Sequence, residues 1–184
     1  ARDAAVVAAL GRLGCDSMRA AAATHCPDAW AVGVRHSGGW GLVYSGDTRP
    51  SDAVVGLGID LPACRILVHE ATFDDTDEMR REAVDRRHST INEALLVGSR
   101  MGAWRVVLTH FSQRYPKLPD VREAAANTIV AFDNMRVPFS LLPQLPQLTP
   151  ALVSLLRDEL GGDEAGPANF GPSGDAGVPS GELG

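Results

Sequence analysis

The chain has 184 residues, a formal net charge of −6 at pH 7 and 45% hydrophobic residues. This length suits one domain with a modest core and leaves no need for a second full domain. No apolar run approaches the roughly 20 residues that a membrane helix requires, and the N-terminus lacks the basic-then-apolar order of a signal peptide. We therefore expect a soluble protein without a membrane partner.

Three cysteines, Cys15, Cys26 and Cys64, are spaced irregularly along the chain. An odd number at such spacing fits neither a disulfide framework nor a thiolate zinc site. We expect reduced and buried thiols.

The order of apolar and polar residues predicts alternating strands and helices. The expected elements are a helix at 3–13, strands at 17–23, 29–34 and 40–44, a helix at 51–57, a strand at 64–68, a charged helix that ends near residue 85, a helix that begins after residue 90, a strand at 104–108 and a helix at 120–132. This order indicates an α/β fold. The chain begins at Ala1, inside an expected helix without a clear cap, so we expect a piece of a longer protein.

Two segments near the C-terminus have compositions that bury little apolar surface. Residues 138–150 are rich in proline, and residues 161–184 are rich in Gly, Pro, Asp and Glu. Such segments do not order themselves readily. We expect one α/β domain over residues 1–160 and a disordered tail over residues 161–184.

Four of the five histidines belong to short polar motifs. The motifs are His25-Cys-Pro, His69-Glu70-Ala-Thr, His88-Ser-Thr and Leu-Thr-His110-Phe-Ser, and the sequence Tyr-Ser-Gly-Asp47-Thr lies between the first two. Imidazole nitrogens and carboxylate oxygens presented from strand ends or loops are the ligands that a catalytic zinc ion uses. A metal site is therefore the first hypothesis.

Each candidate residue also has an ordinary structural interpretation. His25 can be a loop histidine, Asp47 a turn residue, and His110 a strand-end histidine satisfied by hydrogen bonds. Glu70 and His88 can form a solvated ion pair, and Ser89 or Thr90 can cap the following helix. Arg114 suits a bidentate contact with phosphate, but an exposed arginine also serves solubility or packing.

The motifs YSGDT, HEAT, HST and LTHFSQRY, in this order, resemble tRNase Z, especially the C-terminal half of its long form. The resemblance covers roughly residues 20–150. It implies the metallo-β-lactamase fold, a four-layer αββα sandwich of which this chain supplies the second half. It also implies an endoribonuclease that removes the 3′ trailer from precursor tRNA.

The resemblance assigns roles to individual residues. His25 would bind one metal ion, Asp47 would bridge two, and His110 would bind the second, with zinc as the expected ion and manganese as the alternative. His88 and Glu70 would be the catalytic pair for proton transfer. The candidate substrate contacts are Arg114 and Thr90.

The chain departs from the family in two respects. The cluster His-x-His-x-Asp-His, which supplies most metal ligands in the family, is absent from these residues, as is the basic arm that grips tRNA. We therefore expect the missing N-terminal half in the same polypeptide or in a partner chain, and no activity from this chain alone. An acidic chain also attracts RNA phosphates weakly. The resemblance implies a nuclear or mitochondrial location in a eukaryote, which the sequence itself does not assign.

Two alternatives from other classes remain. One is a metallo-β-lactamase-fold hydrolase that acts on a different ester, and the other is a non-catalytic scaffold. The presence of both the HEAT and the HST motif favours the endoribonuclease.

Overall fold

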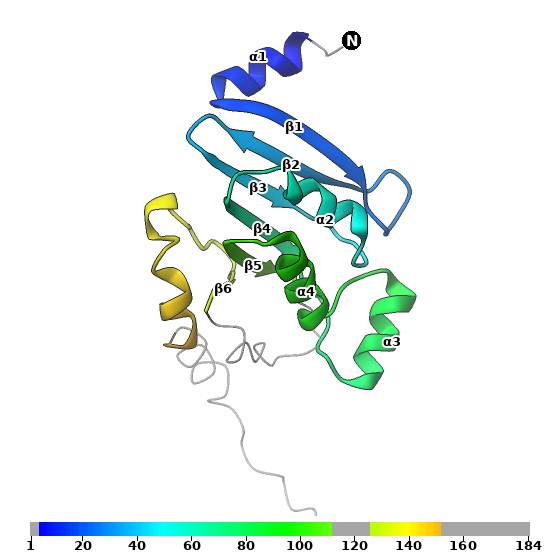
Figure 1. The fold of residues 1–184 in the computed structure, drawn as a ribbon. Coiled ribbons are helices and arrows are strands. Elements are labelled where there is room, and N and C mark those ends of the chain that lie inside the picture. The colour runs from blue at the N-terminus through cyan, green and yellow to red at the C-terminus, as the bar shows by residue number, and fades with distance from the viewer. Residues whose placement is uncertain (1–3, 112–125, 152–184) are drawn as a thin grey trace, which may run out of the picture.

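A six-stranded sheet forms the centre of the protein in a computed structural model that describes residues 4–111 and 126–151 (Figure 1). The strands are β1 (Cys15–Ala22), β2 (Trp30–His36), β3 (Trp40–Tyr44), β4 (Cys64–Glu70), β5 (Arg105–Thr109) and β6 (Thr128–Val130). The helices are α1 (Ala4–Arg12), α2 (Asp52–Ile59), α3 (Asp77–Arg86) and α4 (Ile91–Met101), with a 3₁₀ turn, η2, at Phe139–Leu141. The expected α/β class and the strands up to β5 are confirmed, with small shifts at their ends.

The direction of the strands brings several loops to one edge of the sheet. The strand order is β1 to β6 in sequence, β1, β2 and β3 pair antiparallel, and β3, β4, β5 and β6 pair parallel. The C-terminal ends of β1, β3, β4 and β5 therefore meet at the same edge. This is the edge at which ligands commonly bind in open α/β sheets.

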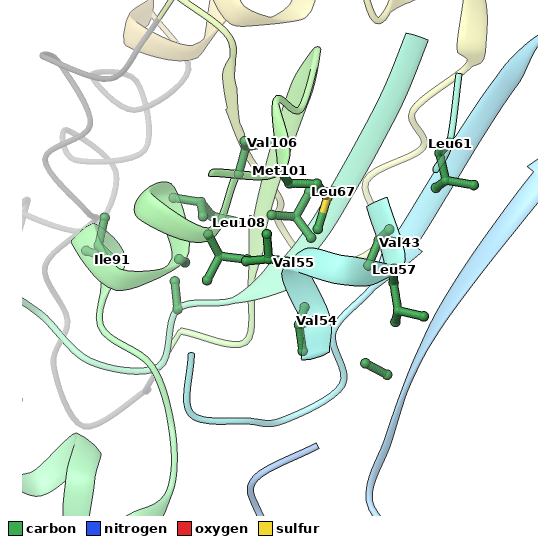
Figure 2. Close-up of a cluster of buried hydrophobic side chains, with 14 of the residues drawn as sticks. Val43, Val54, Val55, Leu57, Leu61, Leu67, Ile91, Met101, Val106 and Leu108 are labelled. Atoms are coloured by element: carbon green, nitrogen blue, oxygen red, sulfur yellow. The ribbon is translucent and has the colours of Figure 1, made fainter. Parts of the chain in front are cut away.

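The main hydrophobic core lies between the sheet and the pair α2 and α4, which cover one face (Figures 1 and 2). Val43 and Leu67 from the sheet are fully buried there, and Val54 and Met101 from the two helices close the layer. Alternate residues of a strand point to opposite faces, so Val43 of β3 and Leu67 of β4 enter this core, while Ile66 and Val68 face the other side of the sheet. The crossover helices thus fix the strands whose ends carry the motifs.

Hydroxyl side chains cap the N-termini of the three α-helices that follow β3 and β4. Ser51 accepts a hydrogen bond from the Val54 amide, and Thr76 accepts one from the Met79 amide. Thr90 forms a capping box with Glu93 at the start of α4. The predicted cap of α4 is therefore confirmed.

The opposite face of the sheet is only partly covered. Residues 135–145 pack over the β4–β6 end, where Leu142 and Leu145 join Ile66 and Val107. Over β1–β3 the same face carries apolar side chains that are about half exposed, namely Met18 (47%), Trp30 (55%) and Tyr44 (50%). The sheet therefore has an open apolar face, as a half-sandwich should.

Three expectations are wrong. Residues 128–130 form strand β6 rather than the end of a helix, because these β-branched residues are buried and pair in parallel with β5. The Pro-rich segment 138–150 is ordered, since its Leu142 and Leu145 pack on the sheet. None of the three cysteines is buried, since Cys26 is exposed and Cys15 and Cys64 are partly exposed, although all three are free as expected. The predicted tail, 161–184, lies outside the described residues.

Among the described residues, no helix has the length and apolar character needed to cross a bilayer.

We predict opposite effects of alanine at two helical glycines. A Cβ atom at Gly98 would lie 2.5 Å from Cγ2 of Val106, which is 1% exposed, whereas a Cβ at Gly56 would meet nothing within 4 Å. The steric cost at Gly98, about 1–3 kcal/mol, should exceed the gain in helix propensity of about 1 kcal/mol. Urea unfolding should show a lower midpoint for Gly98→Ala and an unchanged or higher one for Gly56→Ala. Equal midpoints would contradict the packing described here.

We also predict a pH dependence of stability that arises from His69, which is fully buried in β4. Burial lowers the pKa of this imidazole below its ordinary value of about 6.5. Its Nδ1 lies 2.7 Å from the Glu70 carbonyl oxygen, while its buried Nε2 has no hydrogen-bond partner in the part of the chain described. In the neutral ring, Nδ1–H donates to that carbonyl.

The direction of this pH dependence follows from which state binds the proton first. As pH falls below about 6.5, the unfolded chain binds a proton at His69 before the folded protein does, so the free energy of unfolding decreases. His69→Asn cannot take up this proton. The stability of wild type relative to His69→Asn should therefore decrease between about pH 7.5 and about pH 5.5. A constant difference measured by urea unfolding would show that His69 is not buried as a neutral group.

Candidate active site

Four loops at the C-terminal edge of the sheet carry the residues singled out from the sequence. His25 follows β1, Asp47 follows β3, Glu70 ends β4 and His110 follows β5. His88 comes from the loop between α3 and α4. The structure brings all five side chains together, although they are spread over 86 positions of the sequence.

Asp47 lies between two histidines, and each of its carboxylate oxygens faces a different ring. Oδ2 is 4.0 Å from His25 Nε2, and Oδ1 is 3.7 Å from His110 Nδ1. These separations exceed hydrogen-bond length. The carboxylate therefore lies between the two rings without a hydrogen bond to either, and the His110 nitrogen nearest to it is Nδ1, which Thr72 contacts.

A reciprocal contact with Arg87 holds the ring of His25. Nδ1 of His25 lies 3.0 Å from the Arg87 carbonyl oxygen, and the Arg87 guanidinium donates to the His25 carbonyl oxygen at 2.8 Å. Arg87 is the C-cap of α3 and has a left-handed backbone, with φ of 59°. A carbonyl that accepts from Nδ1–H leaves Nε2 free, and this is how proteins commonly orient a metal-binding histidine.

Thr72 holds the ring of His110 in a similar way. Its hydroxyl lies 2.8 Å from His110 Nδ1 and donates to Glu70 Oε2 at 2.7 Å. The hydroxyl has one proton, so it accepts from His110 Nδ1–H while it donates to the carboxylate. Nε2 of His110 is then available to a ligand.

Glu70 is the buried centre of the site, with only 2% of the residue exposed. Its Oε1 accepts from the backbone amides of Thr48 and Ser89 and from His88 Nδ1, at 2.9, 3.1 and 3.0 Å. Its Oε2 accepts from the amide and the hydroxyl of Thr72, at 3.1 and 2.7 Å. Five donors from three loops thus compensate for the burial of one carboxylate.

His88 is positioned between the two other rings of the site. Its ring centroid lies 4.6 Å from that of His25 and 5.4 Å from that of His110. The bond from Nδ1 to Glu70 fixes the ring, so that Nε2 is the nitrogen that remains available. A histidine oriented by a buried carboxylate is the arrangement of a general acid or base.

The donor set fits divalent metal ions. Ligand atoms of His25, Asp47 and His88 lie within 4.8 Å of one another, and so do those of Glu70, His88 and His110. Imidazole and carboxylate are zinc ligands, and the rings of His25 and His110 have their Nδ1 atoms engaged by oxygen atoms. By distance alone His88 belongs to both groups, but its bond to the buried Glu70 distinguishes it from the other two histidines.

The structure describes one of the two residues that were expected to contact substrate. Arg114 lies outside the described residues. Thr90 is fully buried, and its hydroxyl accepts from the Glu93 amide in the capping box of α4. A contact between Thr90 and substrate stays a prediction, one that this burial does not favour.

The roles of three further residues were not deduced from the sequence. Thr48 and Thr72 stand within the motifs around Asp47 and Glu70, but only the folded loops show that they donate to the Glu70 carboxylate. Arg87 precedes His88 in the chain and contacts His25 instead. Its left-handed cap had no sequence signal, because such caps are usually glycine.

The fold matches that of metallo-β-lactamase-fold proteins. Bacillus subtilis YhfI, a protein with this fold, superposes with a TM-score of 0.50 over 64% of this chain and 47% of its own, at 18% identity. A long-form RNase Z from yeast superposes with a TM-score of 0.68 over 84% of this chain and 22% of its own, at 30% identity. The expected fold class is confirmed by these structures.

Sequence relatives define the family more narrowly. A mitochondrial tRNase Z of Arabidopsis thaliana, TRZ4, is 40% identical over 162 residues, and the zinc phosphodiesterase ELAC protein 2 of Rattus norvegicus is 43% identical over 140 residues. No family model matches the chain. The chain belongs to the tRNase Z family, as its motifs indicated. It spans 17% and 16% of these two relatives, while 82% and 74% of its own length is matched.

We predict that metal content separates the ligands from the proton-transfer pair. In the complete enzyme that contains this chain, Asp47→Ala should lose bound metal because the bridging carboxylate is gone, whereas His88→Ala should retain it. Inductively coupled plasma mass spectrometry of the gel-filtered proteins measures this directly. Loss of an equivalent of metal in His88→Ala would make His88 a ligand.

Proposed function

We propose that this chain is the C-terminal part of a metal-dependent endoribonuclease that removes the 3′ trailer from precursor tRNA. The observation that carries the proposal is the bond between His88 and the buried Glu70, beside an Asp47 carboxylate that lies near both His25 and His110. Membership of the tRNase Z family supports the same reaction. In this proposal one group of residues holds metal ions and the other group handles the proton of the leaving oxygen.

His88 protonates the leaving 3′ oxygen of the RNA strand. A ribose oxygen is a poor leaving group as an anion, so its departure needs an acid placed close to the scissile bond. The Nδ1 bond to Glu70 leaves Nε2 as the nitrogen available for proton transfer, and the ring centroid lies 4.6 Å from that of His25 and 5.4 Å from that of His110. Glu70 acts by orienting this ring and by neutralising its charge when it is protonated.

His25, Asp47 and His110 would hold two zinc ions, with Asp47 between them. Bound zinc supplies a water of lowered pKa as nucleophile and stabilises negative charge on the phosphate. The name of the rat relative, a zinc phosphodiesterase, supports zinc over manganese. A catalytic zinc ion normally has about three protein ligands. One histidine and a shared aspartate fall short of that number for each ion.

The remaining ligands come from a preceding segment of the same polypeptide or from a partner chain that carries the His-x-His-x-Asp-His cluster. The open apolar face over β1–β3, with Met18, Trp30 and Tyr44 about half exposed, supports such a partner. An exposed apolar face of this kind is typical of an interaction surface. In this proposal the chain alone is inactive, and the acidic chain leaves most of the attraction for tRNA phosphates to the rest of the enzyme. The mitochondrial Arabidopsis relative supports a mitochondrial location over a nuclear one.

A hydrolase of the same fold that acts on another ester is the alternative. It would use a cluster like that around Asp47, but an ester with a stable leaving anion gives it no use for an acid. The burial of Glu70 behind five hydrogen bonds, and its bond to His88, therefore favour the RNA substrate.

We predict that replacing His88 affects substrates according to their leaving groups. In the complete enzyme, His88→Ala should lower the rate on precursor tRNA by roughly 100- to 10,000-fold, the usual contribution of a general acid. Hydrolysis of bis(p-nitrophenyl) phosphate should change little, because nitrophenolate leaves without a proton. Asp47→Ala, the matched control for a damaged metal site, should lower both rates.

The cut site and the rates test different parts of the proposal. Mapping of the tRNA product should place its 3′ end at the junction with the trailer. A cut elsewhere, or none by a metal-loaded enzyme that hydrolyses the nitrophenyl ester, would favour the alternative hydrolase. Equal loss of both activities in His88→Ala would contradict the acid role.

A further inference from the structure

Arg49 stands two residues after Asp47, and its side chain reaches the loop of His88. One guanidinium nitrogen, Nη1, donates to the His88 carbonyl oxygen at 2.7 Å and to Glu93 Oε2 at 2.7 Å. The other, Nη2, pairs with Glu93 Oε1. The Arg49 side chain is 20% exposed and that of Glu93 is 29% exposed, so the pair is largely shielded from water.

The backbone of Arg49 is joined to the loop that carries His25. Its amide donates to the Thr24 carbonyl oxygen at 3.0 Å, and the Thr24 amide donates to Thr48 Oγ1 at 3.0 Å. These bonds form an antiparallel bridge between residues 24 and 49. Arg49 therefore links the two loops that carry His25 and Asp47 to the backbone of His88.

Both α3 and the sheet edge hold the loop of His88, because the Ser89 amide donates to Glu70 Oε1 at 3.1 Å and the Ser89 hydroxyl donates to the Thr48 carbonyl oxygen at 2.6 Å. The His88 amide donates to the Ala83 carbonyl oxygen at 2.9 Å, in the last turn of α3. That helix buries only Met79 and Ala83 and lies to the side of the sheet (Figure 1). The carbonyl of His88 is instead held by Arg49, which fixes this peptide relative to the sheet edge.

We propose that Arg49, held by Glu93, is a positioning residue that sets the distance between the proton donor His88 and the metal-binding side chains. This inference rests on the proposed acid role of His88. Arg49 touches neither the substrate nor the metal in this account, and acts only through the His88 peptide. Glu93 keeps the guanidinium in place while it also closes the capping box at Thr90.

A lysine cannot replace Arg49 in this role. The guanidinium is a planar fork that reaches a carbonyl and both oxygens of a carboxylate at once, whereas a lysine offers one nitrogen on a flexible stem. Arg49→Lys keeps the charge and loses the geometry. Arg100→Lys is the matched control, because Arg100 pairs with Asp52 at 2.7 Å on the exposed surface.

The test uses the complete enzyme and two substrates, precursor tRNA and bis(p-nitrophenyl) phosphate. Arg49→Lys should lower kcat on precursor tRNA by roughly 10- to 100-fold, the usual effect of removing an outer partner of a site. KM for tRNA, metal content and hydrolysis of the nitrophenyl ester should change little. Arg100→Lys should match wild type on both substrates.

A double variant separates positioning from general damage. If Arg49 acts through His88, Arg49→Lys should cause no further loss on precursor tRNA in the His88→Ala background. Losses that multiply in the double variant, or an equal loss on both substrates in Arg49→Lys, would overturn the inference and leave the acid role of His88 intact. Equal loss on both substrates in His88→Ala itself would overturn the proposed acid role, and this inference with it.

Glu93→Gln provides a second route if Arg49→Lys does not fold. It removes the charge of the carboxylate but keeps an oxygen for the Thr90 amide. The same selective loss on precursor tRNA, of smaller size, is expected. Wild-type rates on both substrates in this variant would overturn the role of the pair.

Discussion

The buried carboxylate of Glu70 is the interaction on which the site depends. A carboxylate that is 2% exposed is tolerated only when its oxygens accept hydrogen bonds, and here the donors come from three separate loops. Because each loop must approach Glu70 to complete this set, satisfying the carboxylate also fixes the loops that carry Asp47 and His88. The Thr72 hydroxyl extends the same constraint to His110. One desolvated charge thus positions the side chains for which we propose proton transfer and metal binding.

The topology agrees with the proposal that this chain contributes part of a metal site. Parallel strands deliver their C-terminal ends to one edge, and the crossover helices α2 and α4 hold those strands from one side only. The other face over β1–β3 stays apolar and open, so the same sheet that presents His25 and Asp47 also presents a surface for a second layer. The incomplete ligand set and the open face both agree with the proposed preceding segment or partner chain. The chain matches about a sixth of the length of each relative, which agrees with a site divided between two parts of a longer protein.

Much of the fold and the grouping of the candidate site residues was predictable, because both follow from local patterns. Strand ends marked by apolar runs place His25, Asp47, Glu70 and His110 at one edge once the strands are parallel. Contacts between loops that are distant in the sequence have no local sequence pattern that would predict them. Arg87 contacts His25 only through a left-handed backbone, and Arg49 reaches His88 across 39 positions of sequence. The sequence pattern predicts helix for residues 128–130. Their conformation is instead decided by pairing with β5, which is a tertiary effect.

The most direct test of this account is reconstitution of the site. Zinc stoichiometry and cleavage of precursor tRNA would be measured for this chain alone, and again after addition of the preceding half that carries the His-x-His-x-Asp-His cluster. The account predicts two tightly bound zinc ions and cleavage at the trailer junction only when both parts are present. Tight binding of two ions and full activity by this chain alone would contradict it.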